Sequence, residues 1–151
     1  MLRIAVFSGS FDPITIGHED IALRATSFFD KVIIAVGENI QKKCLFTLEQ
    51  RIEFLKVCFK NNEKIEIDCY QGLTSEYCQK KNALIIRGIR NVQDFQYENE
   101  IAQTNKMLFG VETVFIPCTP HLSCISSSIF RDIYLHGGDY TKLLPSSVVI
   151  K

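Results

Sequence analysis

Short apolar runs alternate with helix-length segments along this chain, and that alternation constrains the fold more than any other feature. The strand-like runs are residues 2–7, 32–36, 65–69, 83–86 and 113–117, and the helix-like segments are 17–29, 48–60, 75–81, 92–108 and 127–136. Strands separated by helix-length connections favour a parallel sheet with right-handed crossovers. We therefore expect an α/β fold: one Rossmann-like domain over residues 1–151, a doubly wound sheet of five parallel strands with helices on both faces.

A polar motif follows each of the five predicted strands. These motifs occupy residues 9–18, 37–43, 72–74, 87–90 and 119–128. The carboxyl ends of parallel strands share one edge of the sheet, and ligands of doubly wound sheets bind outside that edge. We therefore expect the five motifs to line one site.

The first motif, GSFDPITIGH at residues 9–18, joins a buried strand to a helix that Gly17 and His18 should open. Free backbone N–H groups and the helix dipole favour anions at a helix N-terminus, and a histidine adds one more donor. Asp12 and Pro13 both favour turns, so we interpret them as shaping this one. The motif indicates a grip on the phosphates of a nucleotide.

Further motifs accompany this one in order along the chain. They are Lys42-Lys43 followed by FTLEQR at 46–51, IRGIR at 86–90, DFQYE at 94–98 and ISSS at 125–128. Together with Thr15, Gly17 and His18, they make the chain similar to nucleotidylyltransferases that carry the T/HxGH signature. Over nearly its whole length, it most closely resembles the bacterial phosphopantetheine adenylyltransferases.

The resemblance implies transfer of the adenylyl group of ATP to 4′-phosphopantetheine, with dephospho-coenzyme A and pyrophosphate as products. The attacking phosphate monoester has a second pKa of about 6, so it is mostly dianionic at neutral pH and needs no base. Catalysis is then expected from charge neutralisation and positioning, without a covalent enzyme intermediate. The resemblance also implies Mg²⁺ bound with ATP, and a homo-hexamer.

Residue roles carried over from the family fall into three groups. The catalytic residues implied are His18, Lys42 and Arg90, and those that bind phosphopantetheine are Ser10, Lys42, Thr74 and Arg87. Those implied to bind ATP are Ser10, Phe11, His18, Gly88, Ile89, Arg90, Glu98, Leu122, Ser123, Cys124, Ile125, Ser126, Ser127 and Ser128. The family usually has threonine where this chain has Ser10, which keeps the hydroxyl.

Each of these residues also has a simpler structural interpretation. His18 and the serines suit helix caps, and Lys42 suits a solvated loop. Arg87 and Arg90 suit salt bridges with Asp94 and Glu98. The role of Arg131, one helical turn after the serines, stays open at this stage.

Charge and cysteine content exclude several classes of function. Lysine plus arginine equals aspartate plus glutamate, at 17 each, so net charge favours neither nucleic-acid nor membrane binding. The chain shows no signal-peptide pattern, and we expect a cytoplasmic protein. The cysteines never form a C-x-x-C pair, which argues against a zinc or thioredoxin-like site, and we expect them to stay reduced. They are Cys44, Cys58, Cys69, Cys78, Cys118 and Cys124.

Two alternative functions remain open from the sequence. One is another T/HxGH enzyme, such as a cytidylyltransferase or a nicotinate-mononucleotide adenylyltransferase. The other is a nucleotide-binding regulator without catalysis, although His18 and Lys42, whose loss would mark such decay, are both present.

Overall fold

The computed structural model describes residues 1–151, in which five parallel strands form one sheet in the order β3-β2-β1-β4-β5. The strands are β1 (Ile4–Gly9), β2 (Lys31–Glu38), β3 (Ile65–Gln71), β4 (Leu84–Ile89) and β5 (Thr113–Pro117). The expected doubly wound sheet is confirmed. Its strand order reverses between β1 and β4, which is where such sheets bind ligands.

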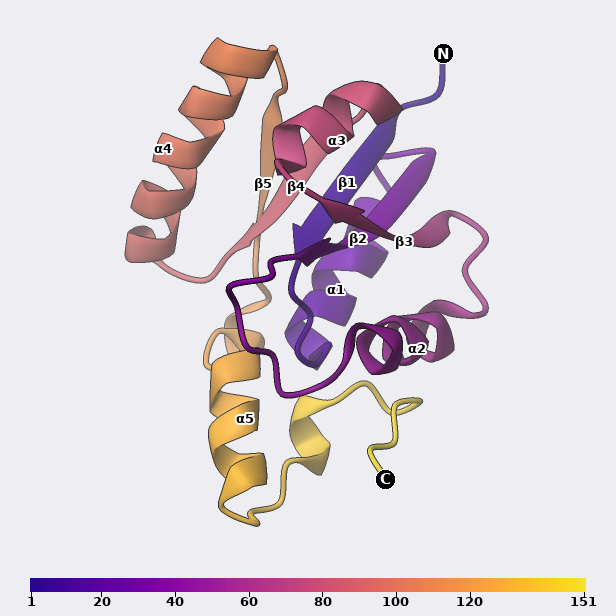
Figure 1. Ribbon diagram of the computed structural model, residues 1–151, viewed down its shortest axis with the longest axis vertical. Helices are drawn as coiled ribbons and strands as arrows, with labels where there is room; N and C mark the ends of the chain where they lie inside the picture. The colour runs from indigo at the N-terminus through magenta and orange to yellow at the C-terminus, as the bar shows by residue number, and fades with distance from the viewer.

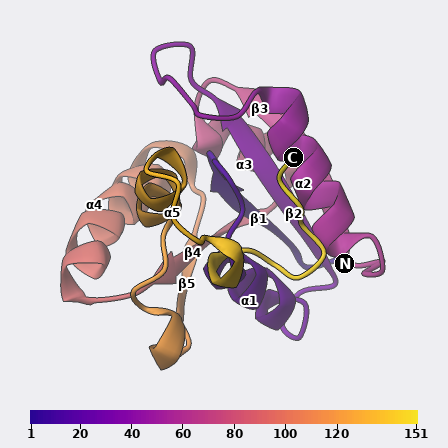
Figure 2. The same cartoon turned by 90° about the horizontal axis from the view of Figure 1, so that it is seen from below.

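Helices cover both faces of this sheet. They are α1 (Ile16–Ala25), α2 (Leu48–Phe59), α3 (Thr74–Lys81), α4 (Val92–Phe109) and α5 (Ser127–Leu135), with short 3₁₀ turns η1 (Pro120–Leu122) and η2 (Thr141–Leu143). Seen from below, α1 and α2 lie on one side of the strands, and α3 and α4 lie on the other (Figure 2). The sheet is therefore shielded from water on both sides.

The central strands β1 and β2 carry continuous apolar runs because successive side chains enter two different cores, whereas the edge strand β3 alternates with Glu66 and Asp68. Phe7 and Ile34 point into a core shared with α1, α2 and α5, whereas Val6 and Ile33 point into a smaller one under α3. A strand buried on both faces has no polar side, so it reads as a continuous apolar run rather than an alternating one. The residues between the strands are thereby left to carry the polar chemistry.

Most element boundaries shift by one to four residues from the sequence prediction, and two of the shifts change how the chain packs. β4 continues past residue 86 to Ile89, because Arg87, Gly88 and Ile89 pair with β5. The first helix ends at Ala25 rather than near residue 29, and the chain turns there so that Phe29 enters the core. The strand extension matters for function, because it places Arg87 on a rigid strand end instead of in a loop.

The carboxyl ends of the strands point toward α5 and the C-terminal segment, whereas the N-terminus lies at the far end of the molecule (Figure 1). The C-terminal segment packs Leu144 and Val148 into the larger core. None of the helices is both long enough and apolar enough to cross a membrane. Because the strands are parallel, the loops that follow them meet at one edge of the sheet, and α5 lies below that edge in Figure 1.

Candidate active site

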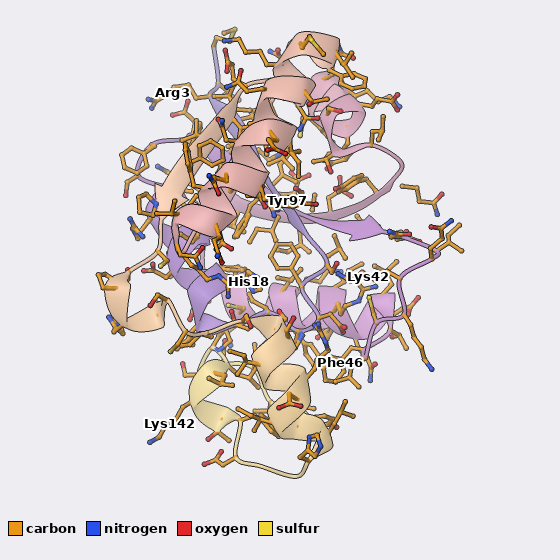
Figure 3. All side chains as sticks on the ribbon, turned by 90° about the vertical axis from the view of Figure 1, so that its left-hand side faces the viewer. Arg3, His18, Lys42, Phe46, Tyr97 and Lys142 are labelled. Atoms are coloured by element: carbon orange, nitrogen blue, oxygen red, sulfur yellow. The ribbon has the colours of Figure 1, made fainter.

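A cleft of about 420 Å³ opens at the carboxyl edge of the sheet. Most of the predicted site residues line it: Ser10, Phe11, His18, Lys42, Arg87, Gly88, Arg90, Glu98, Leu122, Ile125, Ser126, Ser127 and Ser128. Figure 3 shows His18 and Lys42 near the middle of the molecule, between Arg3 at one end and Lys142 at the other. The structure thus brings together side chains that are more than one hundred residues apart in sequence.

Four predicted site residues do not line this cleft. Thr74 lines a neighbouring pocket of about 230 Å³, which shares Arg87 and Glu98 with the cleft. Ile89 and Ser123 line an apolar hollow beside Arg90, on the outer side of the rim. Cys124 is exposed and lines none of these three spaces. The main cleft therefore holds most of the predicted site residues, and Thr74 lines an adjoining pocket.

His18 is oriented by a capping box at the start of α1. The backbone N–H of Thr15 donates to Nδ1 of His18 at 3.1 Å, and the backbone N–H of His18 donates to Oγ1 of Thr15 at 3.4 Å. Histidine takes the N3 position that glutamate or glutamine usually occupies in this motif. Because Nδ1 accepts a hydrogen bond, the ring hydrogen sits on Nε2. His18 is thus both a helix cap and a hydrogen-bond donor for the cleft.

The imidazole of His18 is neutral at neutral pH. Burial of the ring, together with the smaller effects of the positive charges of Arg87 and Arg90, lowers its pKa to about 4. Phe11 contacts the ring edge-on, with centroids 5.0 Å apart, and its own backbone adopts a φ of 45° that few residues other than glycine accept. The motif holds a neutral imidazole in a fixed orientation.

Ser10 and Lys42 form a pair across two loops. Nζ of Lys42 donates to Oγ of Ser10 at 2.8 Å. Lys42 is otherwise exposed, and its side chain is in no salt bridge. The ammonium group therefore keeps most of its capacity for an anion in the cleft.

Asp12 does more than shape the turn after β1. Its carboxylate is buried and accepts the backbone N–H groups of Leu45 at 2.8 Å and Phe46 at 2.9 Å. Arg131 of α5 donates to the backbone carbonyl of Asp12 at 2.9 Å and pairs with its carboxylate at 3.7 Å. Asp12 thus joins the turn after β1, the loop that carries Lys42 and α5, which sequence spacing alone did not reveal.

The two arginines of the fourth motif are each held by a carboxylate of α4. Arg87 donates from Nε and Nη2 to both oxygens of Glu98, at 2.9 and 2.6 Å, and from Nη1 to the Ser8 carbonyl at 2.7 Å. Arg90 donates from Nε to Asp94 at 3.1 Å. The salt-bridge interpretation is confirmed for both, and the same contacts aim the guanidinium groups at the cleft.

Gly88 lies between these arginines for a steric reason. A Cβ atom there would meet Cγ1 of Ile21 at 3.1 Å, which is tighter than ordinary packing. The missing side chain lets α1 approach β4 closely, so that the N-terminus of α1 and the arginines border the same space. Ile21 itself lines the cleft, and no polar pattern in the sequence points to it.

The serine motif both caps α5 and joins it to the first turn. Oγ of Ser126 accepts the N–H of Ile129 at 3.2 Å, which is the predicted N-cap. Ser127 donates to the carbonyl of Pro13 at 2.8 Å, and Ser128 accepts from Arg131 at 3.2 Å. A capped helix N-terminus facing the cleft is an anion site in its own right.

Clustered metal-ligand side chains and reactive thiols would be two further sources of chemistry. No three His, Cys, Asp or Glu side chains are grouped so as to hold a metal ion. All six cysteines are free thiols, and burial raises the pKa of both Cys58 and Cys78 to about 12. Those two thiols therefore stay protonated near neutral pH.

Comparisons with known proteins agree with this geometry. The family described as cytidylyltransferase-like matches residues 6–133. A phosphopantetheine adenylyltransferase of Flavobacterium johnsoniae is 47% identical over 151 residues, 99% of each chain. One from Carboxydothermus hydrogenoformans is also 47% identical and covers 99% of this chain and 94% of its own.

Solved structures support the fold. A bifunctional NMN adenylyltransferase/ADP ribose pyrophosphatase from Francisella tularensis, in complex with AMP and manganese, superposes with a TM-score of 0.71 at 18% identity. The match covers 98% of this chain and 46% of that one. The two relatives are 47% identical to this chain over almost its full length, and the predicted motifs line one cleft. The chain therefore belongs to the phosphopantetheine adenylyltransferases.

Proposed function

We propose that this protein transfers the adenylyl group of ATP to the phosphate of 4′-phosphopantetheine, which gives dephospho-coenzyme A and pyrophosphate. One observation carries the proposal: His18, Lys42 and Arg87, from three separate segments, border one cleft together with the capped start of α5. A reaction between two phosphorylated molecules needs such a concentration of donors and positive charge. No covalent intermediate is required, because the substrate phosphate is itself the nucleophile.

The tautomer and pKa of His18 define its role in this reaction. A neutral ring with a pKa of about 4 is a poor proton acceptor, but its Nε2–H is an effective hydrogen-bond donor. We assign that donor to the oxygens of the α-phosphate, where negative charge builds as the adenylyl group is transferred. Lys42 and Arg90 neutralise charge beside it.

ATP occupies the cleft between the first turn and α5. The N–H groups and hydroxyls of residues 126–128 supply donors for its phosphates, and Arg90 and Gly88 border the space from β4. Mg²⁺ enters as the ATP complex and is a part of the substrate. It keeps several waters and takes phosphate oxygens, so a dedicated carboxylate cage is not needed.

Phosphopantetheine occupies the adjoining pocket. The pocket around Thr74 is lined by Tyr97, Ile101 and Asn105 of α4, and it meets the main cleft at Arg87. An arm that alternates amide and methylene groups suits this mixture of aromatic, aliphatic and amide side chains. Its phosphate then lies between Arg87 and Lys42, next to the α-phosphate of ATP.

The assembly we propose is a cytoplasmic homo-hexamer. The observation that supports assembly is the outer surface of α4, where large apolar side chains are exposed. These include Val92 at 74%, Met107 at 77% and Leu108 at 62% exposed. An exposed apolar surface of this kind marks a protein contact. Light scattering tests the hexamer directly, and a monomeric mass would contradict it.

The activity is tested by incubating the purified protein with MgATP and 4′-phosphopantetheine and measuring pyrophosphate release. Parallel reactions replace the acceptor with nicotinate mononucleotide, or ATP with CTP. Release only with phosphopantetheine and ATP supports the proposal. Release only in a parallel reaction assigns the chain to a sister enzyme, and nucleotide binding without release in any of them identifies a regulator.

A further inference from the structure

Positive side chains around the cleft are not all balanced by carboxylates. Four such side chains line the cleft, and a fifth, Arg51, lines a second hollow that shares Ser10 and Lys42 with the cleft. Three of the five form salt bridges: Arg87 with Glu98, Arg90 with Asp94 and Arg131 with Asp12. The remaining two are Lys42 and Arg51. The unbalanced charge of the site is therefore concentrated on these two side chains.

Both of these side chains bind the same residue from different sides. Lys42 donates to the hydroxyl of Ser10, as described above. Arg51 of α2 donates from Nη1 to the backbone carbonyl of Ser10 at 2.7 Å, and its Nε lies 3.4 Å from the carbonyl of Thr47. Two cationic side chains without a salt-bridge partner therefore both donate hydrogen bonds to Ser10, in the turn after β1.

Arg51 is unusual because it is buried without an ionic partner. Only 6% of it is exposed, yet no carboxylate lies within 4 Å of its guanidinium. Asp12, on the same turn, is occupied by backbone N–H groups and by Arg131. Glu38, across the hollow, accepts a hydrogen bond from Gln71.

Burying a cation costs hydration free energy, and carbonyl partners carry no full negative charge to offset it. The exposed Glu49 lies beyond salt-bridge distance and offsets the charge of Arg51 only from a distance. Sites that break a stability rule in this way are commonly functional. We propose that Arg51 is a positioning residue for the bound phosphates: it anchors the Ser10 turn, and an anion in the cleft completes the balance of its charge. This inference rests on the proposed function for the identity of that anion.

The test measures binding of pyrophosphate to two variants by calorimetry and by the rise in Tm. Arg51→Gln keeps a donor for the Ser10 carbonyl but removes the charge, and Arg51→Lys keeps the charge. We expect Arg51→Gln to bind pyrophosphate about tenfold more weakly and to gain less thermal stability from it, because one unit of charge beside the site is lost. Arg51→Lys should bind within about threefold of the unchanged protein.

The matched control is Arg3→Gln, which makes the same change of net charge at the opposite end of the sheet (Figure 3). Pyrophosphate affinity should not change in that variant. A purely structural arginine would instead lower the Tm of the ligand-free protein and leave pyrophosphate affinity unchanged, and that result would overturn the inference. An equal loss of affinity in Arg51→Lys and Arg51→Gln would also overturn it.

If Arg51→Gln does not fold, Arg51→Met takes its place, because it also removes the charge, and the same loss of pyrophosphate affinity is expected of it. Failure of the proposed function would look different from failure of this inference. If only the function failed, the protein without substitutions would bind pyrophosphate more tightly than Arg51→Gln does and yet fail to adenylylate phosphopantetheine. That result would contradict the proposed function and support the role of Arg51.

Discussion

The turn after β1 and the loop after β2 each present a phosphate-directed side chain, but they hold it in opposite ways. Residues 11–15 of the turn are all buried, and His18 behind them is fixed by a capping box. Residues 39–43 of the loop are all exposed, and the ammonium of Lys42 has one hydrogen bond, to Ser10. The orientation of His18 is fixed before the substrate binds, whereas the side chain of Lys42 can still move to contact the substrate.

This difference predicts a division of labour. A donor that is already aimed costs no reorganisation during the reaction, so it acts mainly on the transition state. An exposed ammonium on a long stem becomes ordered as the substrate phosphate binds, so it acts on the ground state as well. Loss of His18 should therefore appear in kcat, and loss of Lys42 should appear in KM.

The largest expected effect is that of His18→Ala. Removing one preorganised donor to a developing charge costs about 10²–10³ in kcat, and KM should change far less. The matched variant is His18→Gln, which restores a side chain able to complete the capping box and so separates lost catalysis from a frayed helix. Steady-state kinetics measure both, and an unchanged kcat in His18→Ala would remove His18 from the mechanism.

Lys42→Ala should raise the KM for phosphopantetheine by roughly 10- to 100-fold, because a charge-assisted hydrogen bond to phosphate is lost. The KM for ATP should rise less. Its neighbour Lys43 is equally exposed and provides the control, since Lys43→Ala should leave both values unchanged. A larger effect on ATP than on phosphopantetheine would mean that Lys42 serves the other substrate.

Asp12→Asn tests the connection between the two loops. Asparagine has one acceptor oxygen, so one of the N–H groups of Leu45 and Phe46 would lose its partner, at a cost of about 1–3 kcal/mol in stability. Urea unfolding measures that loss, with the exposed Asp139→Asn as the control. The KM for phosphopantetheine should rise as well, because Asp12 anchors the loop that carries Lys42; an unchanged KM would show that the loop is held elsewhere.

The smallest expected effect concerns pH. The pKa of His18 is about 4 in the folded protein and near 6.5 when unfolded, so the unfolded state takes up a proton first as pH falls. Stability should therefore be complete above about pH 6.5 and decline toward pH 4, with a loss on the order of 1–2 kcal/mol by pH 5. Urea unfolding at pH 7.5 and 5 should show this loss in the unchanged protein and a smaller one in His18→Gln. Equal losses would show that the pKa of His18 is the same in the folded and unfolded states.

Much of this protein could be predicted from the sequence because the determining interactions are local. Apolar runs separated by helix-length connections specify parallel strands, and the start of α1 follows from residues 15–18. Thr15 and His18 are three positions apart, which is the spacing of a capping box. The individual site residues came from the family resemblance, and the expectation that they share one site came from the polar motifs that follow parallel strands, which must meet at one edge.

What only the tertiary structure decided are the pairings between segments. Asp12 lies 33 or more residues from the N–H groups it binds, and Arg51 lies 41 residues from the Ser10 carbonyl it donates to. Whether an arginine has a carboxylate or stands alone depends on which segments the fold brings within a few ångströms. Spacing along the chain determines helices and strands, whereas charge balance in a cleft depends on distances through space, and those exist only once the sheet has formed.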